Sequence, residues 1–327
     1  MIWILLGVTI IAGALLSPYF LTETNIINTL EHASILGIMV IGQSLCYLSG
    51  NFDLSSESTL GFTGMLGAWL ITSSGPPAMG SGLEINPLIA LIVMFGIGAL
   101  IGYINGFFVT RVKINNFVLT LAMLLILRGA AMVVNKGITV SRIPESFLSL
   151  GNKSVGSIPI SIFVLIAFFI AAYVFTRYTQ FGRNIYAVGG NRDAAIASGI
   201  DANKIIRQVY IISGIIATFA GWMYVGKIAS ANALMGQNMN FEVQAAAVIG
   251  GISLFGGRGN MIGALGGVIL LSAITSLLQL LGISAFWIDA VRGVIILFAM
   301  LVDTQKNYFK RVEFASAVTS NSKTVKA

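Results

Sequence analysis

Long apolar stretches, separated by short polar segments, run along most of the chain. Each is about 17 to 25 residues long, which is enough for a helix that crosses a bilayer. A soluble protein does not bury so many such stretches in succession. The pattern therefore predicts an all-α integral membrane protein, a polytopic bundle of about ten transmembrane helices. The stretches lie near residues 1–17, 30–49, 57–74, 86–110, 116–134, 157–176, 205–227, 240–256, 260–282 and 287–303.

Two of the polar separators are very short, so the number of spans is an estimate. SGNFDLSSES stands between the second and third stretches, and FGGRGN stands between the eighth and ninth. Either is compatible with a broken or re-entrant element inside the membrane. The first stretch has no basic n-region and no clear small-residue cleavage site, so it is interpreted as a retained span.

Composition agrees with the membrane prediction. The chain has 56% hydrophobic and 9% charged residues, and its mean hydropathy is +0.90, whereas a soluble protein has about 25% charged residues. A net charge of +7 would suit nucleic acid, but the charges lie in the loops and the tail. The expected partner is the lipid bilayer and not nucleic acid. With one cysteine and one histidine, Cys46 and His32, neither a disulfide within the chain nor a Cys-His metal cluster is expected.

Lysine and arginine positions indicate the orientation. With a cytoplasmic N-terminus, the inner segments hold twelve of these residues and the outer loops hold four. This excess follows the positive-inside rule and predicts a multi-pass protein with both termini in the cytoplasm. Residues 1–303 form the predicted transmembrane domain, and residues 304–327 form a polar cytoplasmic tail.

The longest inner segment, residues 177–204, reads RYTQFGRNIYAVGGNRDAAIASGIDANK. We expect Gly189 and Gly190 to break the chain, Asn191 to cap a short helix, and Gly199 to end that helix. The segment is predicted to place one short amphipathic helix at the membrane surface. The simpler alternative is a surface helix that only links two spans.

Polar residues at membrane depth are candidates for function. Asn51, Asp53, Ser55 and Glu57 cluster with two further serines at the break after the second stretch. They are candidates for the translocation path or a gate. The alternative is that Asp53 and Ser55 cap the following span, with Glu57 in its first turn.

Three further charged residues fall inside two of the predicted spans. Arg128 needs acceptors because an unpaired charge in hydrocarbon is costly. Asp289 and Arg292 are three residues apart, so they can pair on one face of a helix. All three are interpreted as structural intramembrane charges.

Four segments together resemble the permeases of the ribose-type ABC sugar importer family, the binding-protein-dependent transport system inner membrane components. They are GNFDLSSES, INNFVLTLAMLLILRGAAMVV, the inner segment at 177–204, and AAAVIGGISLFGGRGNMIGALGGVIL. They occur in the family's order, and the resemblance covers about residues 20–303.

The resemblance implies an ABC importer transmembrane domain in the bacterial inner membrane. It implies that this chain translocates a small sugar or sugar-like ligand, and that the inner segment is the coupling loop that docks on separate ATP-binding cassette subunits. Other implied partners are an extracytoplasmic solute-binding protein and a second permease copy, in a homodimer or a heterodimer. The implied contacts to the ATPase are Gly190, Asn191, Ala194, Ala195, Ser198, Gly199 and Ile200.

The chain itself contains no G-x-x-x-x-G-K-[ST] phosphate loop, so ATP is expected to be hydrolysed by the partner. No nucleophile, base and acid set is visible, and neither a cofactor nor enzymatic activity is expected. A membrane enzyme is thereby disfavoured.

The chain departs from the family's pattern at two places. Where the family motif reads like GGIDLSVGS, this chain has Asn51-Phe52 and Ser56-Glu57, which puts local gating or substrate preference in doubt. Glu242 matches a family acid, whereas many relatives carry a second acid at the position of Gln244. Both are candidates for the opening of the path, and the alternative for Glu242 is an interfacial acid without substrate contact.

The main rival function is an ion-coupled secondary transporter of a small polar solute. It would need a titratable relay, for which Asp53, Glu57, Glu242 and Asp289 are the candidates. None of them is flanked in mid-span by a histidine or a second carboxylate. The sequence leaves the ligand open among ribose, another sugar, a furanone-type signal and a nucleoside.

Overall fold

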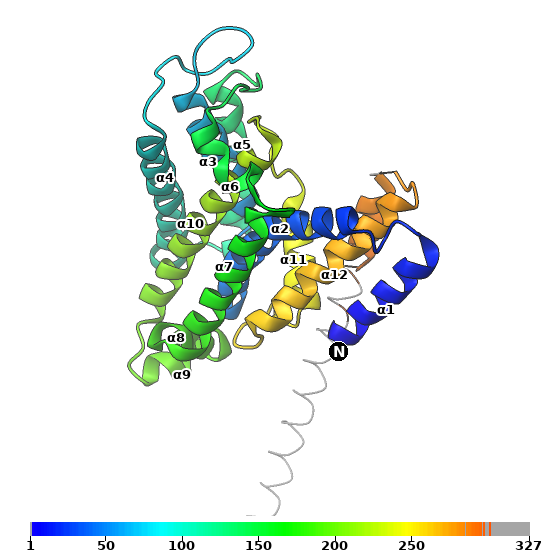
Figure 1. Ribbon diagram of the computed structural model, residues 1–327. Coiled ribbons are helices and arrows are strands. Elements are labelled where there is room, and N and C mark those ends of the chain that lie inside the picture. Colours follow the sequence, from blue (N-terminus) through cyan, green and yellow to red (C-terminus); the bar gives the residue numbers. More distant parts are fainter. Residues whose placement is uncertain (1, 285, 296, 298–300, 302–327) are drawn as a thin grey trace, which may run out of the picture.

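The computed structural model describes residues 2–284, 286–295, 297 and 301, and their regular structure is almost entirely helical (Figure 1). One small antiparallel hairpin pairs β1 (Ser154–Val155) with β2 (Ile158–Pro159). The helices are α1 (Ile2–Leu16), α2 (Glu23–Leu48), α3 (Ser56–Ile71), α4 (Pro87–Phe107), the π-helical turn η1 (Phe108–Val112), α5 (Asn116–Val134), α6 (Glu145–Asn152), α7 (Ile160–Tyr178), α8 (Gln180–Gly190), α9 (Arg192–Ala197), α10 (Ala202–Ile228), α11 (Met239–Ile249) and α12 (Met261–Leu280).

Nine of the ten predicted apolar stretches contain one of these helices. In the described part, six helices are long and apolar enough to cross a membrane: α2, α4 with η1, α5, α7, α10 and α12. The helices α1, α3 and α11 are shorter. In the tenth stretch, residues 286–295 are helical. The rest of that stretch lies mostly outside the described residues, as does the predicted tail at 304–327. The all-helical, polytopic prediction is confirmed.

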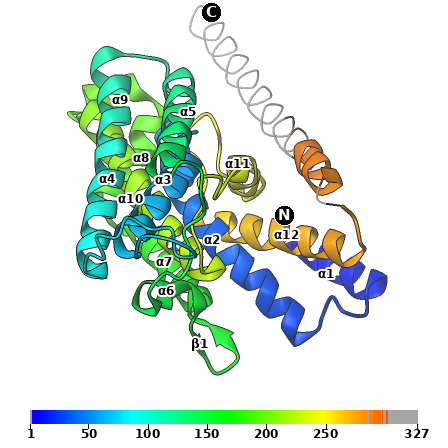
Figure 2. The same cartoon turned by 90° about the horizontal axis from the view of Figure 1, so that it is seen from above.

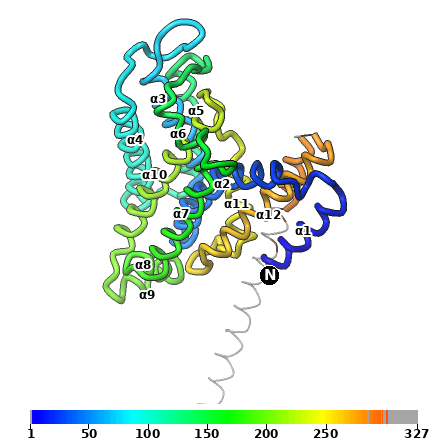
Figure 3. Tube along the Cα trace, in the orientation of Figure 1, coloured from blue at the N-terminus to red at the C-terminus, as the bar shows by residue number. Residues whose placement is uncertain are grey.

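The long helix α10 forms the centre of the bundle. It packs against α2, α3, α4 and α6, and it runs beside α4 in Figure 1. Seen from above, α12 and α1 lie beside this bundle, and α2 reaches between the two groups (Figure 2). The tube in Figure 3 shows α8 and α9 at one end of the molecule, whereas the loop between α3 and α4 lies at the opposite end.

Asparagine side chains define where several spans begin. Asn86 accepts a hydrogen bond from the Leu88 N–H at 2.9 Å, and Asn115 accepts one from the Phe117 N–H at 3.0 Å. The first N–H groups of a helix have no partner in the preceding turn, and these amides satisfy one of them. At α4 the next residue is Pro87, whose missing N–H removes one of the unpaired donors. The same local chemistry therefore places the ends of α4 and α5.

Glycines allow α4 and α10 to touch through their backbones. A Cβ on Gly102 would overlap the carbonyl oxygen of Tyr210, and a Cβ on Gly214 would overlap the carbonyl oxygen of Gly98. In lipid no hydrophobic driving force brings helices together. Close van der Waals contact of this kind is therefore a main source of helix association. The glycines of α4 and α10 thus form a close helix interface at this place.

We expect Gly102→Ala to destabilise the protein and Gly96→Ala not to do so. The methyl group at 102 enters the α10 backbone, which costs about 1–3 kcal/mol. Gly96 lies on the same helix with open space around it, and there alanine favours the helix by about 0.5–1 kcal/mol. Thermal unfolding of the two purified variants in detergent checks this. Equal midpoints for both would contradict the backbone contact.

Candidate functional site

The polar break between α2 and α3 is held by three neighbouring helices. Asp53 accepts hydrogen bonds from the Ser55 N–H at 3.0 Å and from the Ser55 hydroxyl at 2.6 Å. Its other carboxylate oxygen accepts from the Ser213 hydroxyl of α10 at 3.0 Å. The Ser55 oxygen also accepts from the side chain of Asn105 on α4, at 2.9 Å. Asn51 accepts from the Asn116 side chain at the start of α5, at 3.2 Å.

These contacts decide how the cap forms. Ser55 occupies the N-cap position of α3, as the capping alternative predicts, but its hydroxyl donates to Asp53 and makes no cap bond. Glu57 lies in the first turn of α3, also as expected. Asp53, Ser55 and Glu57 are all buried, and among the described residues Asp53 forms no ion pair. The break is therefore a closed polar network.

Glu57 lies where two helices begin. One of its carboxylate oxygens is 3.1 Å from the Arg128 guanidinium of α5, and the other accepts from the Asn240 N–H of α11 at 3.1 Å. The side chain of Asn240 donates to the Leu54 carbonyl and accepts from the Ser56 hydroxyl. The carboxylate thus meets the positive ends of α3 and α11 as well as the arginine. The arginine and the backbone N–H donors together compensate the negative charge of the Glu57 carboxylate inside the bundle.

Arg128 satisfies its remaining donors on the segment that leads into α11. Its second terminal nitrogen donates to the carbonyls of Ala233 and Met235, at 2.8 and 2.9 Å. One guanidinium therefore connects α5, the first turn of α3 and the segment between α10 and α11. The position of Arg128 in a span predicted that it needs acceptors, but the sequence did not reveal that Glu57 is one of them.

A second charged group forms around Arg292. Its guanidinium lies 2.9 Å from Asp289, so the predicted pair on one helical face is confirmed. It also lies 2.6 Å from the carboxylate of Glu242 on α11, a contact that joins residues fifty positions apart and that local spacing does not predict. Gln244 is buried on the same short helix. These acids are tied to an arginine in this structure.

The inner segment between α7 and α10 contains two helices where the sequence predicted one. Gly189 and Gly190 do not break the chain, because they form the last turn of α8. Thr179 is the N-cap residue of α8, and its hydroxyl oxygen accepts a hydrogen bond from the Gly182 N–H at 3.0 Å. The strongly two-sided pattern of residues 180–190 was the available signal, but the glycine pair at its end masked it.

The second helix, α9, follows the predicted caps closely. The Asn191 side chain accepts from the Ala194 N–H at 3.0 Å. At the other end Gly199 has a left-handed φ of 83°, and the Ile200 N–H reaches back to the Ala195 carbonyl at 3.0 Å. This is the backbone closure expected of a helix that ends on glycine. A helix of six residues is held rigid by both ends.

The contacts to the ATPase that the resemblance implies differ in exposure. Gly190, Asn191, Ala194, Ser198 and Gly199 are exposed, whereas Ile200 is half-buried. Ala195 is only 4% exposed, so α9 turns it toward its own chain. Ile196, which the sequence analysis did not select, is 52% exposed. An aliphatic residue in a polar surface segment was the signal for it.

A backbone junction connects α8 to both polar separators. The Gly257 N–H donates to the Leu48 carbonyl at the end of α2, at 3.0 Å. Gly189 lies so close that a Cβ on it would overlap this same carbonyl oxygen. The Tyr186 hydroxyl donates to the Gly259 carbonyl at 2.9 Å, and burial raises the pKa of Tyr186, so the phenol keeps its proton. The inner helices, the break and the 250–260 segment therefore form one connected unit.

Comparison with known proteins identifies the family to which this chain belongs. A family described as "Branched-chain amino acid transport system / permease component" matches residues 25–300. The chain belongs to this permease family. Its members are transport components, so the chain is a permease and not an enzyme.

Individual relatives of the permease cover most of its length. The ribose import permease protein of Escherichia coli is 36% identical over 297 residues, which is 89% of each chain. The protein of that name from Bacillus subtilis is 33% identical and covers 92% of this permease and 91% of its own length. The L-arabinose ABC transporter permease protein of Azospirillum brasilense is 32% identical, covering 90% and 84%. No solved structure matches the chain.

We expect Arg128→Met to destabilise the permease by about 3–5 kcal/mol, because it leaves Glu57 charged, buried and unpaired. The double variant Glu57→Gln with Arg128→Met removes the stranded charge and should recover part of the loss. Thermal unfolding of the single and double variants in detergent measures both effects. A double variant no more stable than Arg128→Met alone would show that the ion pair is not the cause.

Proposed function

We propose that this permease is the membrane subunit of an ATP-binding-cassette importer for a small neutral sugar. Separate ATP-binding cassette subunits drive it, an extracytoplasmic solute-binding protein delivers the ligand, and a second permease copy, identical or similar, completes the path. The full family match and the names of the sugar permeases that resemble this chain support the proposal. No cofactor is assigned to this chain.

The observation that carries the mechanism is the connection from α9 to the break. The cap at Asn191 and the closure at Gly199 make α9 a rigid body. Its neighbour α8 meets Leu48 and Gly257 through the backbone. A push on α9 by a closing ATPase therefore reaches the end of α2, beside the Asp53 network, without a compressible side chain between them. We assign Asn51, Asp53, Ser55 and Glu57 to a gate that this push opens.

The proposed topology has about ten spans, with both termini in the cytoplasm of a bacterial inner membrane. The basic residues support it, because α9 then lies inside together with most lysines and arginines. The end of α10 at Ile228 and the segment after it face outward. Glu242 and Gln244, on the short helix α11, line the path between these two faces.

The rival ion-coupled mechanism is less well supported by the geometry. A proton or sodium relay needs carboxylates that are free to exchange their charge. Glu57 is paired with Arg128, and Glu242 and Asp289 share Arg292. Of the four candidate carboxylates, Asp53 alone has no ion pair to a described residue, and Ser55 and Ser213 occupy its oxygens.

Reconstituted transport separates the two mechanisms. We expect proteoliposomes that contain the permease and its ATPase, with binding protein added, to accumulate a pentose or hexose only when ATP is supplied. Ionophores that collapse proton and sodium gradients should leave the rate unchanged. Accumulation that needs an ion gradient and no nucleotide would refute the proposal.

The docking role of α9 is tested best at its exposed apolar residue. We expect Ile196→Glu to abolish most transport while the ATPase subunits still hydrolyse ATP, because a charge there opposes a dry contact. Since Ile196 is exposed, the variant should fold normally. Val155→Glu, at a residue that is 64% exposed on the β1–β2 hairpin, is the charge-matched control. Normal uptake by the Ile196→Glu variant would show that α9 does not form the contact with the ATPase.

A further inference from the structure

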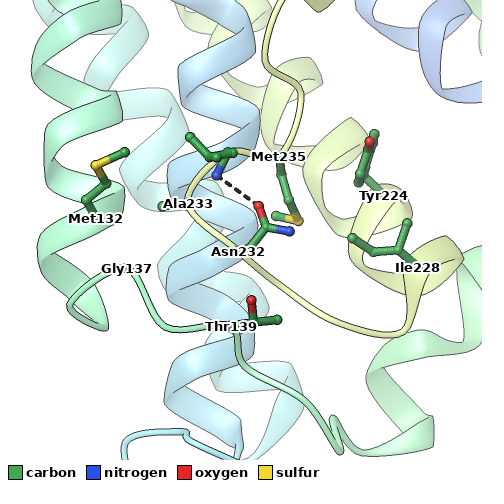
Figure 4. Close-up of a pocket in the computed structure, with 9 residues that line it drawn as sticks. Met132, Gly137, Thr139, Tyr224, Ile228, Asn232, Ala233 and Met235 are labelled. Atoms are coloured by element: carbon green, nitrogen blue, oxygen red, sulfur yellow. Dashed lines mark hydrogen bonds between the residues drawn. The ribbon is translucent and has the colours of Figure 1, made fainter. Parts of the chain in front are cut away.

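A cavity of about 510 Å³ opens at the end of α10 that is far from α8 and α9, and Figure 4 shows the residues that line it. Its wall consists of the end of α5, the turn that follows it, the end of α10 and the segment that leads to α11. The volume lies within the range of roughly 300–1,000 Å³ that small-molecule sites occupy. The cavity lies apart from the Asp53 network. Its lining includes Met132, Thr139, Tyr224, Ile228, Asn232 and Met235.

The lining combines an apolar surface with a few hydrogen-bonding groups. Met132, Met235 and the Tyr224 ring supply the apolar part, and the Thr139 hydroxyl and the Asn232 amide supply the polar part. The Asn232 side-chain oxygen already accepts from the Leu234 N–H at 2.9 Å, the dashed contact in Figure 4. Its NH₂ group therefore remains to donate to a ligand. Among the residues that the structure describes, no aspartate, glutamate, lysine or arginine lines the cavity.

This chemistry distinguishes between the ligand classes that the comparisons suggest. A sugar presents C–H groups on its ring faces and hydroxyls at its rim, which match a lining that contains an aromatic ring, an amide and a hydroxyl. A free amino acid carries two opposite charges, and each would lie unpaired against this lining, at a considerable desolvation cost. An uncharged, polyhydroxylated ligand fits this lining better than a zwitterion.

We propose that this cavity is the site where a neutral monosaccharide first binds the permease from outside. The inference rests on the proposed function, since it assumes that the cavity faces the solute-binding protein. Its position gives it a direct link to the break. Ala233 and Met235 line the cavity, and their carbonyls are the ones that Arg128 binds. Through Arg128 the cavity wall is joined to Glu57, one of the residues that we assign to the gate.

Cysteine protection tests the site without requiring transport. Leu234 lines the cavity and is 51% exposed, whereas Val133 is 79% exposed on α5 outside the lining. The native Cys46 is buried, so it contributes little labelling. Leu234→Cys and the matched control Val133→Cys are treated with maleimide in right-side-out vesicles. The added probes are D-ribose, L-arabinose, D-galactose and, as the zwitterion, L-leucine.

We expect at least one sugar to slow the labelling of Leu234→Cys, by about threefold at twice its Kd. The sugar should not affect Val133→Cys, and leucine should protect neither. Adding Thr139→Val to Leu234→Cys should weaken the protection. The proposal is overturned if no sugar protects, if both cysteines are protected equally, or if leucine protects as well as the sugars.

The same probes separate this inference from the proposed function. If a sugar protects Leu234→Cys but the reconstituted system does not accumulate it with ATP, the proposed cavity site stands and the proposed importer function is refuted. Accumulation with ATP of a sugar that does not protect Leu234→Cys would refute the cavity and leave the importer.

Discussion

A helix that begins inside a bilayer exposes backbone N–H groups where no water can bind them, and this constraint organises the centre of the permease. Two helices, α3 and α11, begin at the same place. Glu57 brings a carboxylate to both starts, and Arg128 neutralises it from α5. An unpaired donor or an unpaired charge in hydrocarbon is costly, so the helix starts, the Glu57 carboxylate and the Arg128 guanidinium stabilise one another. The rest of the bundle is arranged around that group.

The group also explains how an interior so rich in polar residues is compatible with a membrane protein. Asp53, Ser55, Asn105 and Ser213 are linked by hydrogen bonds that join the break to α4 and α10. Some buried polar atoms nevertheless have no protein partner in the described part of the chain, among them the amide of Gln43 and the hydroxyl of Tyr47 on α2. Such atoms are tolerated where a passing solute or water completes them. These α2 side chains therefore keep hydrogen-bonding capacity inside the bundle.

Elements whose signal is local were predictable from the sequence. The apolar period placed nine helices, and the asparagine and glycine rules placed both ends of α9 at Asn191 and Gly199. The pair of Asp289 and Arg292 followed from helical spacing alone. For these elements the deciding contacts lie within a few residues, so a short window contains all the information required.

Features that depend on distant contacts were not predictable in the same way. Glu57 and Arg128, or Glu242 and Arg292, are separated by long stretches of chain, and no pattern in one segment names the partner in another. The helix α8 was not predicted, because a glycine pair such as Gly189-Gly190 normally interrupts a helix. Here Gly189 is required for a close approach to Leu48, and this tertiary contact outweighs the weak helix propensity. The burial of Ala195 likewise depends on what α9 packs against.

The junction of Gly189, Leu48 and Gly257 is made from main-chain atoms, and this has a consequence for how such permeases diversify. Contacts between peptide groups are indifferent to the chemistry of the cargo. Asn232 and Thr139, which line the cavity, take no part in this junction. If α9 drives the permease and the cavity holds the cargo, as we propose, the drive and the choice of cargo depend on different contacts within one chain. A lineage built on this arrangement is able to acquire a new nutrient by altering a few side chains at one face while inheriting an unaltered drive at the other.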